Sequence, residues 1–352
     1  GRMGNPDLKF ETSKKMNVGI DISLLQSRIQ LTADYFRNDI DNIILAAPTP
    51  PSLGVPGNSI ATNIGSMYNK GWEFSLNTVN VNSEYFRWNS TLNISFVKNE
   101  VLKLANNNSD IISAYNITRV GYPIGSFFGY ESAGVNPANG NPLWVKADGS
   151  IVQGNFSNSR YFTYNPANGA DMSTAATALV FADKKIFGSA NPTWFGGFNN
   201  NFSYKGFDLN IFLTFAGGNK IYNITAQESL HNQKFMNSGK EQYERWTTAG
   251  QITKVPKLYY GSDNFVNQNG SLSSRFLEKA DFLRGQNIGI GYTVPSKLIS
   301  PAHLTSLRVF AQIQNAFILT KYSGLDPELS TSVTTNNTPG LDYNVSPLPR
   351  TF

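Results

Sequence analysis

The sequence predicts an all-β fold, an antiparallel transmembrane β-barrel of which this chain forms a part, with long extracellular loops. Three observations predict it: apolar and polar residues alternate along several segments, the connections between these segments are alternately short and long, and charged residues are few. Bacterial outer-membrane barrels combine short periplasmic turns with long extracellular loops, and their strands alternate between lipid and lumen.

The lengths of the connections place the strands in order. Short connections cover residues 25–27, 82–83, 205–206 and 294–304. Long connections cover residues 40–69, 98–192, 218–280 and 321 onward. With all short connections at the periplasmic end, we expect downward strands at residues 11–24, 70–82, 193–205 and 281–293. Upward strands are then expected at residues 27–39, 84–97, 207–217 and 305–318.

The alternation within the strands predicts which face meets lipid. In the segment 84–97 one face is apolar, with Phe86, Trp88, Leu92, Ile94 and Phe96. The other face is polar, with Arg87, Asn89, Thr91, Asn93 and Ser95. The segments 207–217 and 305–318 repeat this pattern. In the segment 193–205 the apolar stripe is weaker because Asn200 falls in its register, which a bulge or a position near the membrane interface would explain.

Composition agrees with a membrane wall and argues against other classes. Charged residues make up 15% of the chain, against roughly 25% in ordinary soluble domains. No apolar run approaches the roughly 18 residues that a membrane helix needs. The net charge of +5 comes from scattered Lys and Arg, which argues against nucleic-acid binding. No secretion signal opens the chain, so we expect a piece of a longer polypeptide.

Several segments, in order along the chain, resemble one family. They are GNPDLKFE at residues 4–11 with NVGID at 17–21 and DYF at 34–36, GYPIGSFFGY at 121–130, DFLR at 281–284 with NIGIGY at 287–292, QNAF at 314–317 with KYSGLDPE at 321–328, and PLPRTF at 347–352. In these segments, and in their order, the chain resembles the SusC/RagA family of TonB-dependent outer-membrane transporters.

The resemblance implies a location and a function. Residues 1–352 would form the C-terminal portion of a barrel of about 22 strands, and we expect the plug domain, the N-terminal extension and the final strand to lie outside this chain. The barrel would sit in the bacterial outer membrane, in contact with its lipid and lipopolysaccharide. TonB would act through the missing N-terminal region, a SusD-like surface lipoprotein would form a lid, and two such complexes would pair. The function implied is active import of an oligosaccharide or an oligopeptide.

Aromatic residues in the two longest loops are candidates for substrate binding, because aromatic rings stack on the apolar faces of sugars. They are Trp144, Tyr161, Tyr164, Tyr243, Trp246, Tyr259 and Tyr260. The alternative is that they pack the loops or contact the lid, since aromatic residues are also enriched in protein interfaces. The pentapeptide NPANG occurs at residues 136–140 and 165–169, where we expect tight turns and no calcium loop.

Enzyme chemistry has no support in the sequence, and we expect neither a cofactor nor a metal. His231 and His303 are the two histidines, cysteine is absent, and no zinc-binding spacing occurs. Asp326 and Glu328 flank Pro327 in a family-like segment, where we expect a structural role.

Two other functions stay open at this point. A secreted or surface-attached β-sandwich that binds glycans or adheres to surfaces also has short amphipathic strands and aromatic loops. Its apolar stripes would be buried against a second sheet, whereas those of a barrel face outward. A passive porin would lack the plug, the TonB contact and the lid, and only the family resemblance argues against it.

Overall fold

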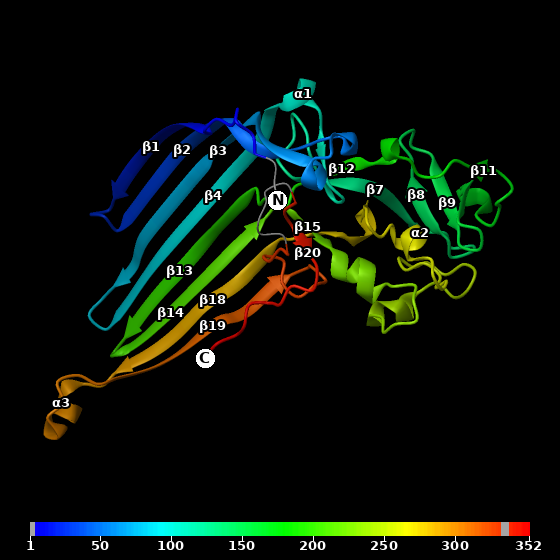
Figure 1. The fold of residues 1–352 in the computed structure, drawn as a ribbon. Helices are drawn as coiled ribbons and strands as arrows, with labels where there is room; N and C mark the ends of the chain where they lie inside the picture. The colour runs from blue at the N-terminus through cyan, green and yellow to red at the C-terminus, as the bar shows by residue number, and fades with distance from the viewer. Residues whose placement is uncertain (1–3, 332–337) are drawn as a thin grey trace.

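A computed structural model describes residues 4–331 and 338–352, and its largest feature is an antiparallel sheet of eight long strands (Figure 1). The strands are β1 (Thr12–Leu24), β2 (Ile29–Pro48), β3 (Ser59–Asn82), β4 (Phe86–Leu104), β13 (Trp194–Tyr204), β14 (Phe207–Gly217), β18 (Phe282–Thr293) and β19 (Arg308–Thr320). Each pairs with the next of the eight along the chain. The eight predicted strands and their up-and-down order are confirmed.

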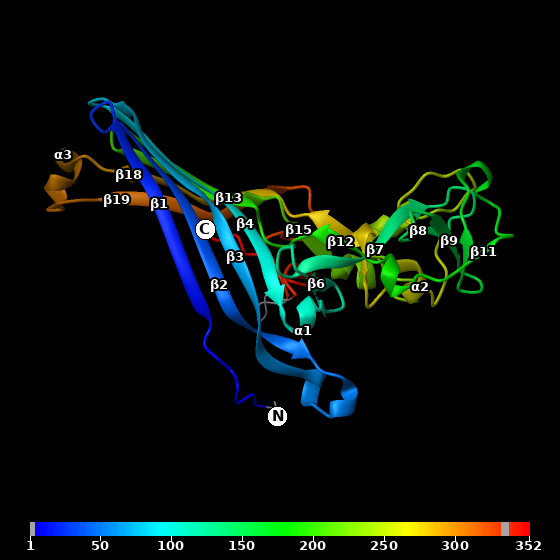
Figure 2. The same ribbon diagram turned by 90° about the horizontal axis from the view of Figure 1, so that it is seen from above.

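The sheet is curved but not closed (Figure 2). Its two edge strands are β1 and β19, which makes it a segment of a barrel wall. The edge of β19 is already engaged near the end of the described chain, because Thr351 forms an antiparallel bridge to Gln314. The amide of Gln314 donates to the carbonyl of Thr351 at 2.8 Å, and the reverse bond is 3.2 Å long.

All short connections lie at one end of the sheet (Figure 1). Between β13 and β14 the turn is only Lys205 and Gly206, both with positive φ, as a two-residue hairpin turn requires. Leu25 to Ser27 also have positive φ in the turn between β1 and β2. The longest connection at this end, between β18 and β19, contains the short helix α3 (Ser296–Ile299).

Three strands are longer than predicted. Because β2 runs to Pro48 and β3 begins at Ser59, the connection predicted at residues 40–69 shrinks to residues 49–58. β4 likewise continues to Leu104. The extensions pack on the loops as well as on each other, since Val101 and Leu104 are buried with Ile124. Where both faces of a strand contact protein, both faces can carry apolar side chains. The alternation of apolar and polar residues that predicted the strands is therefore lost in these extensions.

The long connections fold into two smaller sheets at the other end of the strands, which we call the loop assembly (residues 105–193, 218–281, 321–331 and 338–346). The first sheet contains β5 (Ile111–Ile112), β6 (Asn116–Thr118), β7 (Ser126–Val135), β8 (Pro142–Val145), β9 (Ile151–Asn155), β10 (Arg160–Thr163), β11 (Ala175–Ala176), β12 (Lys185–Gly188) and β16 (Leu272–Ser273). The second contains β15 (Lys220–Asn223), β17 (Leu277–Lys279) and β20 (Leu341–Asp342). The predicted connection from residue 321 onward includes residues 332–337, which lie outside the described residues.

The loop assembly has a core of its own. Phe127, Tyr222 and Leu272 are fully buried in one cluster, and they come from two different connections. Two short helices, α1 (Ala105–Asn108) and α2 (Asp263–Asn267), complete the assembly. Among the residues described, no helix has the length and apolar character needed to cross a membrane.

Candidate functional site

The apolar face of the eight-stranded sheet points away from the protein. Val18 on β1, Ile290 on β18 and Val309 on β19 are 63%, 52% and 63% exposed. A β-sandwich would bury such a stripe against a second sheet, so the sandwich alternative does not fit this structure. The exposed stripe is what a barrel wall presents to lipid.

Aromatic residues mark both ends of this apolar face. At the loop end Tyr35 packs on Trp72 with ring centres 5.2 Å apart, and at the turn end Phe207 packs on Tyr292 at 4.4 Å. β13 has 11 residues, and Trp194 and Tyr204 are the first and the last of them. At about 3.3 Å per residue and a tilt of about 40° they span about 25 Å, the height of the apolar band of outer-membrane barrels.

Asn200 is a polar residue in the apolar register of β13. It accepts hydrogen bonds from Trp88 Nε1 at 3.0 Å and from Ser90 Oγ at 2.7 Å, and it is 8% exposed. Pairing of β13 with both neighbours is continuous past Asn200, so the bulge considered from the sequence is not there. The side chain is tolerated because its oxygen is satisfied by residues on the neighbouring strand. A bulge does occur in β18, between Gly285 and Asn287.

The other face is polar and receives the loops. Asn210 donates to Asn199 and Asn201 at 2.7 and 2.8 Å. Farther up, Asn99 accepts from the amide of Ile124 at 2.8 Å, which anchors the segment 121–130 to the wall. The family-like motif GYPIGSFFGY is therefore a joint between wall and loop assembly.

A second joint is an ion pair buried on the polar face. Arg284 on β18 is 3% exposed, and its Nη2 lies 2.7 Å from Asp326 Oδ1. Its Nε donates to Glu328 Oε2 at 3.1 Å. The structural role expected for Asp326 and Glu328 is confirmed by these contacts. They join two family-like motifs, DFLR and KYSGLDPE, that are distant in sequence.

Two cavities lie where the loop assembly meets the polar face, with volumes of about 470 and 660 Å³. Both are lined by Pro192, Phe195 and Pro339. Glu328 lines the first, where the Arg284 contacts hold it. Sequence reasoning did not find Phe195, although a signal exists, because it is an apolar residue in the polar register of β13.

The seven aromatic candidates do not converge on one site. Trp144 and Tyr161 are 1% and 8% exposed in one cluster of the loop core. A ring covered on both faces cannot stack on a sugar, so these two act as packing residues in this structure. Trp246 donates from Nε1 to the carbonyl of Pro137 at 2.9 Å. Tyr164 is half-buried.

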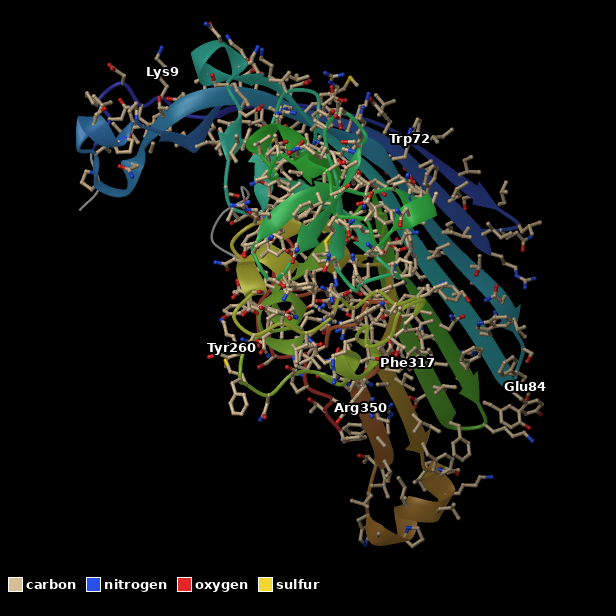
Figure 3. All side chains as sticks on the ribbon, turned by 90° about the vertical axis from the view of Figure 1, so that its right-hand side faces the viewer. Lys9, Trp72, Glu84, Tyr260, Phe317 and Arg350 are labelled. Atoms are coloured by element: carbon tan, nitrogen blue, oxygen red, sulfur yellow. The ribbon has the colours of Figure 1, made fainter. Side chains whose placement is uncertain are left out.

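The other candidates are exposed at the outer part of the loop assembly. Tyr243, Tyr259 and Tyr260 are 87%, 41% and 76% exposed. Figure 3 shows Tyr260 projecting from the edge of the loop assembly, far from Glu84 at the turn end of the strands. Tyr259 packs against Phe156 with the two rings tilted and their centres 5.9 Å apart.

The two NPANG segments are turns, as predicted, and they contact each other. Asn136 Oδ1 accepts from the amide of Ala138, and Asn165 Oδ1 accepts from Ala167, each at 3.0 Å. The side-chain amide of Asn136 donates to the carbonyl of Gly169 at 2.6 Å. The repeat therefore builds a paired turn inside the loop assembly.

Comparison with known proteins decides the family. Residues 1–180 match the family model described as "TonB dependent receptor-like, beta-barrel". The chain belongs to this family. TonB-dependent receptor P3 of Formosa agariphila is 30% identical over 361 residues, which cover 99% of this chain and 34% of that protein. TonB-dependent receptor SusC of Bacteroides thetaiotaomicron is 26% identical and covers 99% of this chain and 32% of its own length.

A solved structure shows the same fold. The RagAB peptide importer in its closed-closed state superimposes with a TM-score of 0.78 and 23% identity, over 99% of this chain and 35% of that one. The resemblance to SusC and RagA is therefore confirmed, as is the partial β-barrel. The TonB-dependent receptor chain spans about a third of the length of the curated relatives it matches.

Proposed function

We propose that this TonB-dependent receptor chain is the C-terminal portion of the barrel wall of an importer of SusC/RagA type in the bacterial outer membrane. The observation that carries the proposal is the division of the sheet into an apolar face of membrane height and a polar face that holds folded loops at one end only. The importer would move its substrate without changing it, with energy delivered through TonB to parts of the protein outside this chain.

The loop assembly would lie outside the cell, under a SusD-like lipoprotein. In support, several large apolar side chains at its outer part are exposed: Phe235 by 97%, Met236 by 67%, Tyr243 by 87% and Ile252 by 94%. Where exposed apolar groups form a contiguous patch, they mark a contact with a protein or a membrane. We further propose that two such complexes pair, as the family resemblance implies.

The test of this arrangement is extraction of the intact parent from its native membrane in mild detergent, followed by mass spectrometry of what accompanies it. A stoichiometric lipoprotein together with plug-domain peptides of the same chain is expected. The mass of the particle reports whether two complexes pair. Recovery in the soluble fraction without detergent would contradict the proposal.

The substrate would be an oligosaccharide or an oligopeptide that enters past the exposed loop aromatics. Tyr259 and Tyr260 are two of the three candidates with accessible rings, the third being Tyr243, and aromatic surfaces suit sugars and peptides alike. Uptake of each substrate class by cells with the intact parent decides between them. Tyr259→Ala with Tyr260→Ala should reduce uptake, whereas Tyr85→Ala at the turn end should not. Equal uptake by the wild type, the double variant and Tyr85→Ala would show that Tyr259 and Tyr260 do not contact the substrate on its path.

A further inference from the structure

The geometry points to a binding site for a phosphate-bearing lipid headgroup on the outer surface of the wall, formed by Arg37, Lys70 and Lys98. This inference rests on the proposed function, because it requires the apolar face to be in a membrane. It goes beyond that function, since the site faces lipid and not the substrate path.

Strand register places the three cations in one row. Arg37 on β2 is directly opposite Lys70 on β3, and Lys70 is directly opposite Lys98 on β4. Residues opposite each other in an antiparallel pair point to the same face, with Cβ atoms about 5 Å apart. The face is the apolar one, because two residues nearer the turn end the same three strands carry an aromatic row of Tyr35, Trp72 and Phe96.

A groove joins the two rows. It has a volume of about 380 Å³, and its lining includes the three aromatic residues together with Lys70 and Lys98. Trp72 and Phe96 are 49% and 45% exposed, so their surfaces are open to a ligand. Figure 3 shows Trp72 on the sheet, away from the turn end that Glu84 marks. The groove is therefore lined by aromatic rings on the side of the turn end and by positive charges on the side of the loop end.

The charges of this row are only partly neutralised. Arg37 pairs with Asp39 at 2.8 Å, and Lys98 pairs with Glu100 at 2.8 Å. Lys70, between them, lies over the ring of Tyr68 at 5.1 Å and forms no ion pair with a described residue. Like charges directly opposite in a sheet destabilise it. A bound anion between Lys70 and its neighbours would remove that repulsion.

The position selects a lipid over a free anion. Aromatic belts lie at the level of the lipid headgroups, so the row just beyond the belt is at the level of lipid phosphates. Basic residues near a membrane surface attract anionic lipid. The next row outward contains Lys14, opposite Asp39, so the acidic residues Asp39 and Glu100 border the site on its outer side only.

The turn end of the wall provides an internal comparison. Lys205 lies over the rings of Tyr85 and Tyr204 at 5.6 and 5.3 Å. It is thus a lysine beside an aromatic belt, but it belongs to a two-residue turn and not to a row of cations across three strands. Lys205→Gln is therefore the matched control for Lys70→Gln.

The experiment uses the intact parent in mild detergent and measures lipid retained in native mass spectrometry. The probes are lipid A with its phosphates and the same lipid after removal of both phosphates. The wild type should prefer the phosphorylated form, and Lys70→Gln should lower that preference about fivefold, which corresponds to about 1 kcal/mol. Lys205→Gln should leave it unchanged. Inorganic phosphate at the same concentration should not displace the lipid.

Equal retention of the two lipids by the wild type, an unchanged preference in Lys70→Gln, or displacement by inorganic phosphate would overturn the lipid site. If Lys70→Gln fails to fold, Lys70→Arg must keep the preference, and the wild-type preference must fall as salt rises. Substrate uptake by the same variants separates the two proposals. Normal uptake without lipid preference rejects only the lipid site, whereas loss of membrane insertion in the wild type rejects the proposed function.

Discussion

The wall and the loop assembly place similar side chains in opposite surroundings. On the wall, Val309 is 63% exposed on the apolar face, whereas in the loop assembly Phe127 is fully buried. The loop assembly is therefore organised like a water-soluble domain, with apolar groups inside. The wall is organised for a solvent that is itself apolar. One chain therefore contains a region suited to lipid and a region suited to water. Substitutions at matched positions in the two regions can test where the boundary between lipid and water lies.

The largest expected effect comes from the same residue type in the two regions. Trp144 is 1% exposed in the loop core, and Trp72 is 49% exposed on the wall. Trp144→Ala should lower the free energy of unfolding of the loop assembly by about 3–5 kcal/mol, as measured by urea titration with limited proteolysis of the loops. Trp72→Ala should cost much less. Equal losses would mean that Trp72 is also covered.

Charge on the apolar face should have the next largest effect. Leu92 lies in the apolar register of β4, and Thr91 lies next to it on the polar face. Leu92→Arg should weaken folding into lipid vesicles by about 2–4 kcal/mol, because an arginine near the midplane meets hydrocarbon. Thr91→Arg should fold nearly as well as the wild type. If both variants fold equally, the facing assignment of the strands is incorrect.

Two ion pairs differ in burial, and they allow the joint between loops and wall to be compared with the exposed surface of the wall. Arg284 and Asp326 are buried where the loops meet the wall, while Arg308 and Asp208 are 46% and 41% exposed in their side chains. Asp326→Asn should destabilise the loop assembly by about 2 kcal/mol, the value of hydrogen bonds to a charged group. Asp208→Asn should cost much less, because water and salt screen an exposed ion pair. The protease sensitivity of the segment after β19 measures both losses. A larger loss in Asp208→Asn than in Asp326→Asn would show that the Arg284–Asp326 pair does not hold the loops on the wall.

The smallest expected effect is a pH dependence confined to the loop assembly. Burial, with a smaller contribution from the positive charge of the adjacent Arg275, lowers the pKa of His231 from 6.5 to about 3. Arg275 donates from Nη2 to His231 Nδ1 at 2.9 Å, which requires the neutral ring. The unfolded chain binds the proton first as pH falls below 6.5, so stability is lost from there downward. Between pH 6.5 and 5.5 the loss should be about 1 kcal/mol.

The control for this pH dependence is the second histidine. His231→Asn should abolish the loss of stability between pH 6.5 and 5.5, and His303→Asn in the turn between β18 and β19 should preserve it. Urea titration of the loop assembly at the two pH values gives the comparison. The same slope in both variants would show that another group titrates.

The sequence was a good guide to the wall because each wall residue meets only lipid or lumen. Period-two alternation then survives, and the β3–β4 turn and the whole β13–β14 hairpin lie within a few residues of the prediction. The alternation fails where strands meet the loops, so the continuation of β4 to Leu104 was missed. It also fails for the small sheets of the loop assembly, whose strands have as few as two residues.

The candidate site was predicted less well, because residue type does not report burial. Trp144 and Tyr260 have similar chemistry, yet one is a core residue and the other projects from the surface. The joint between Arg284 and Asp326 joins residues 42 positions apart, and only the fold brings them together. The family-like motifs marked these joints without revealing what they contact.

The central claim is that the wall crosses the outer membrane with the loop assembly outside and the short turns inside. The chain contains no cysteine, so Tyr260→Cys and Glu84→Cys can each place one reporter in the intact parent, with any cysteines elsewhere replaced. Labelling of intact cells with a membrane-impermeant maleimide is the most direct test. The cysteine at position 260 should react in intact cells, and the one at position 84 only after the outer membrane is permeabilised. Reaction at position 84 in intact cells, or none at position 260, would contradict the claim.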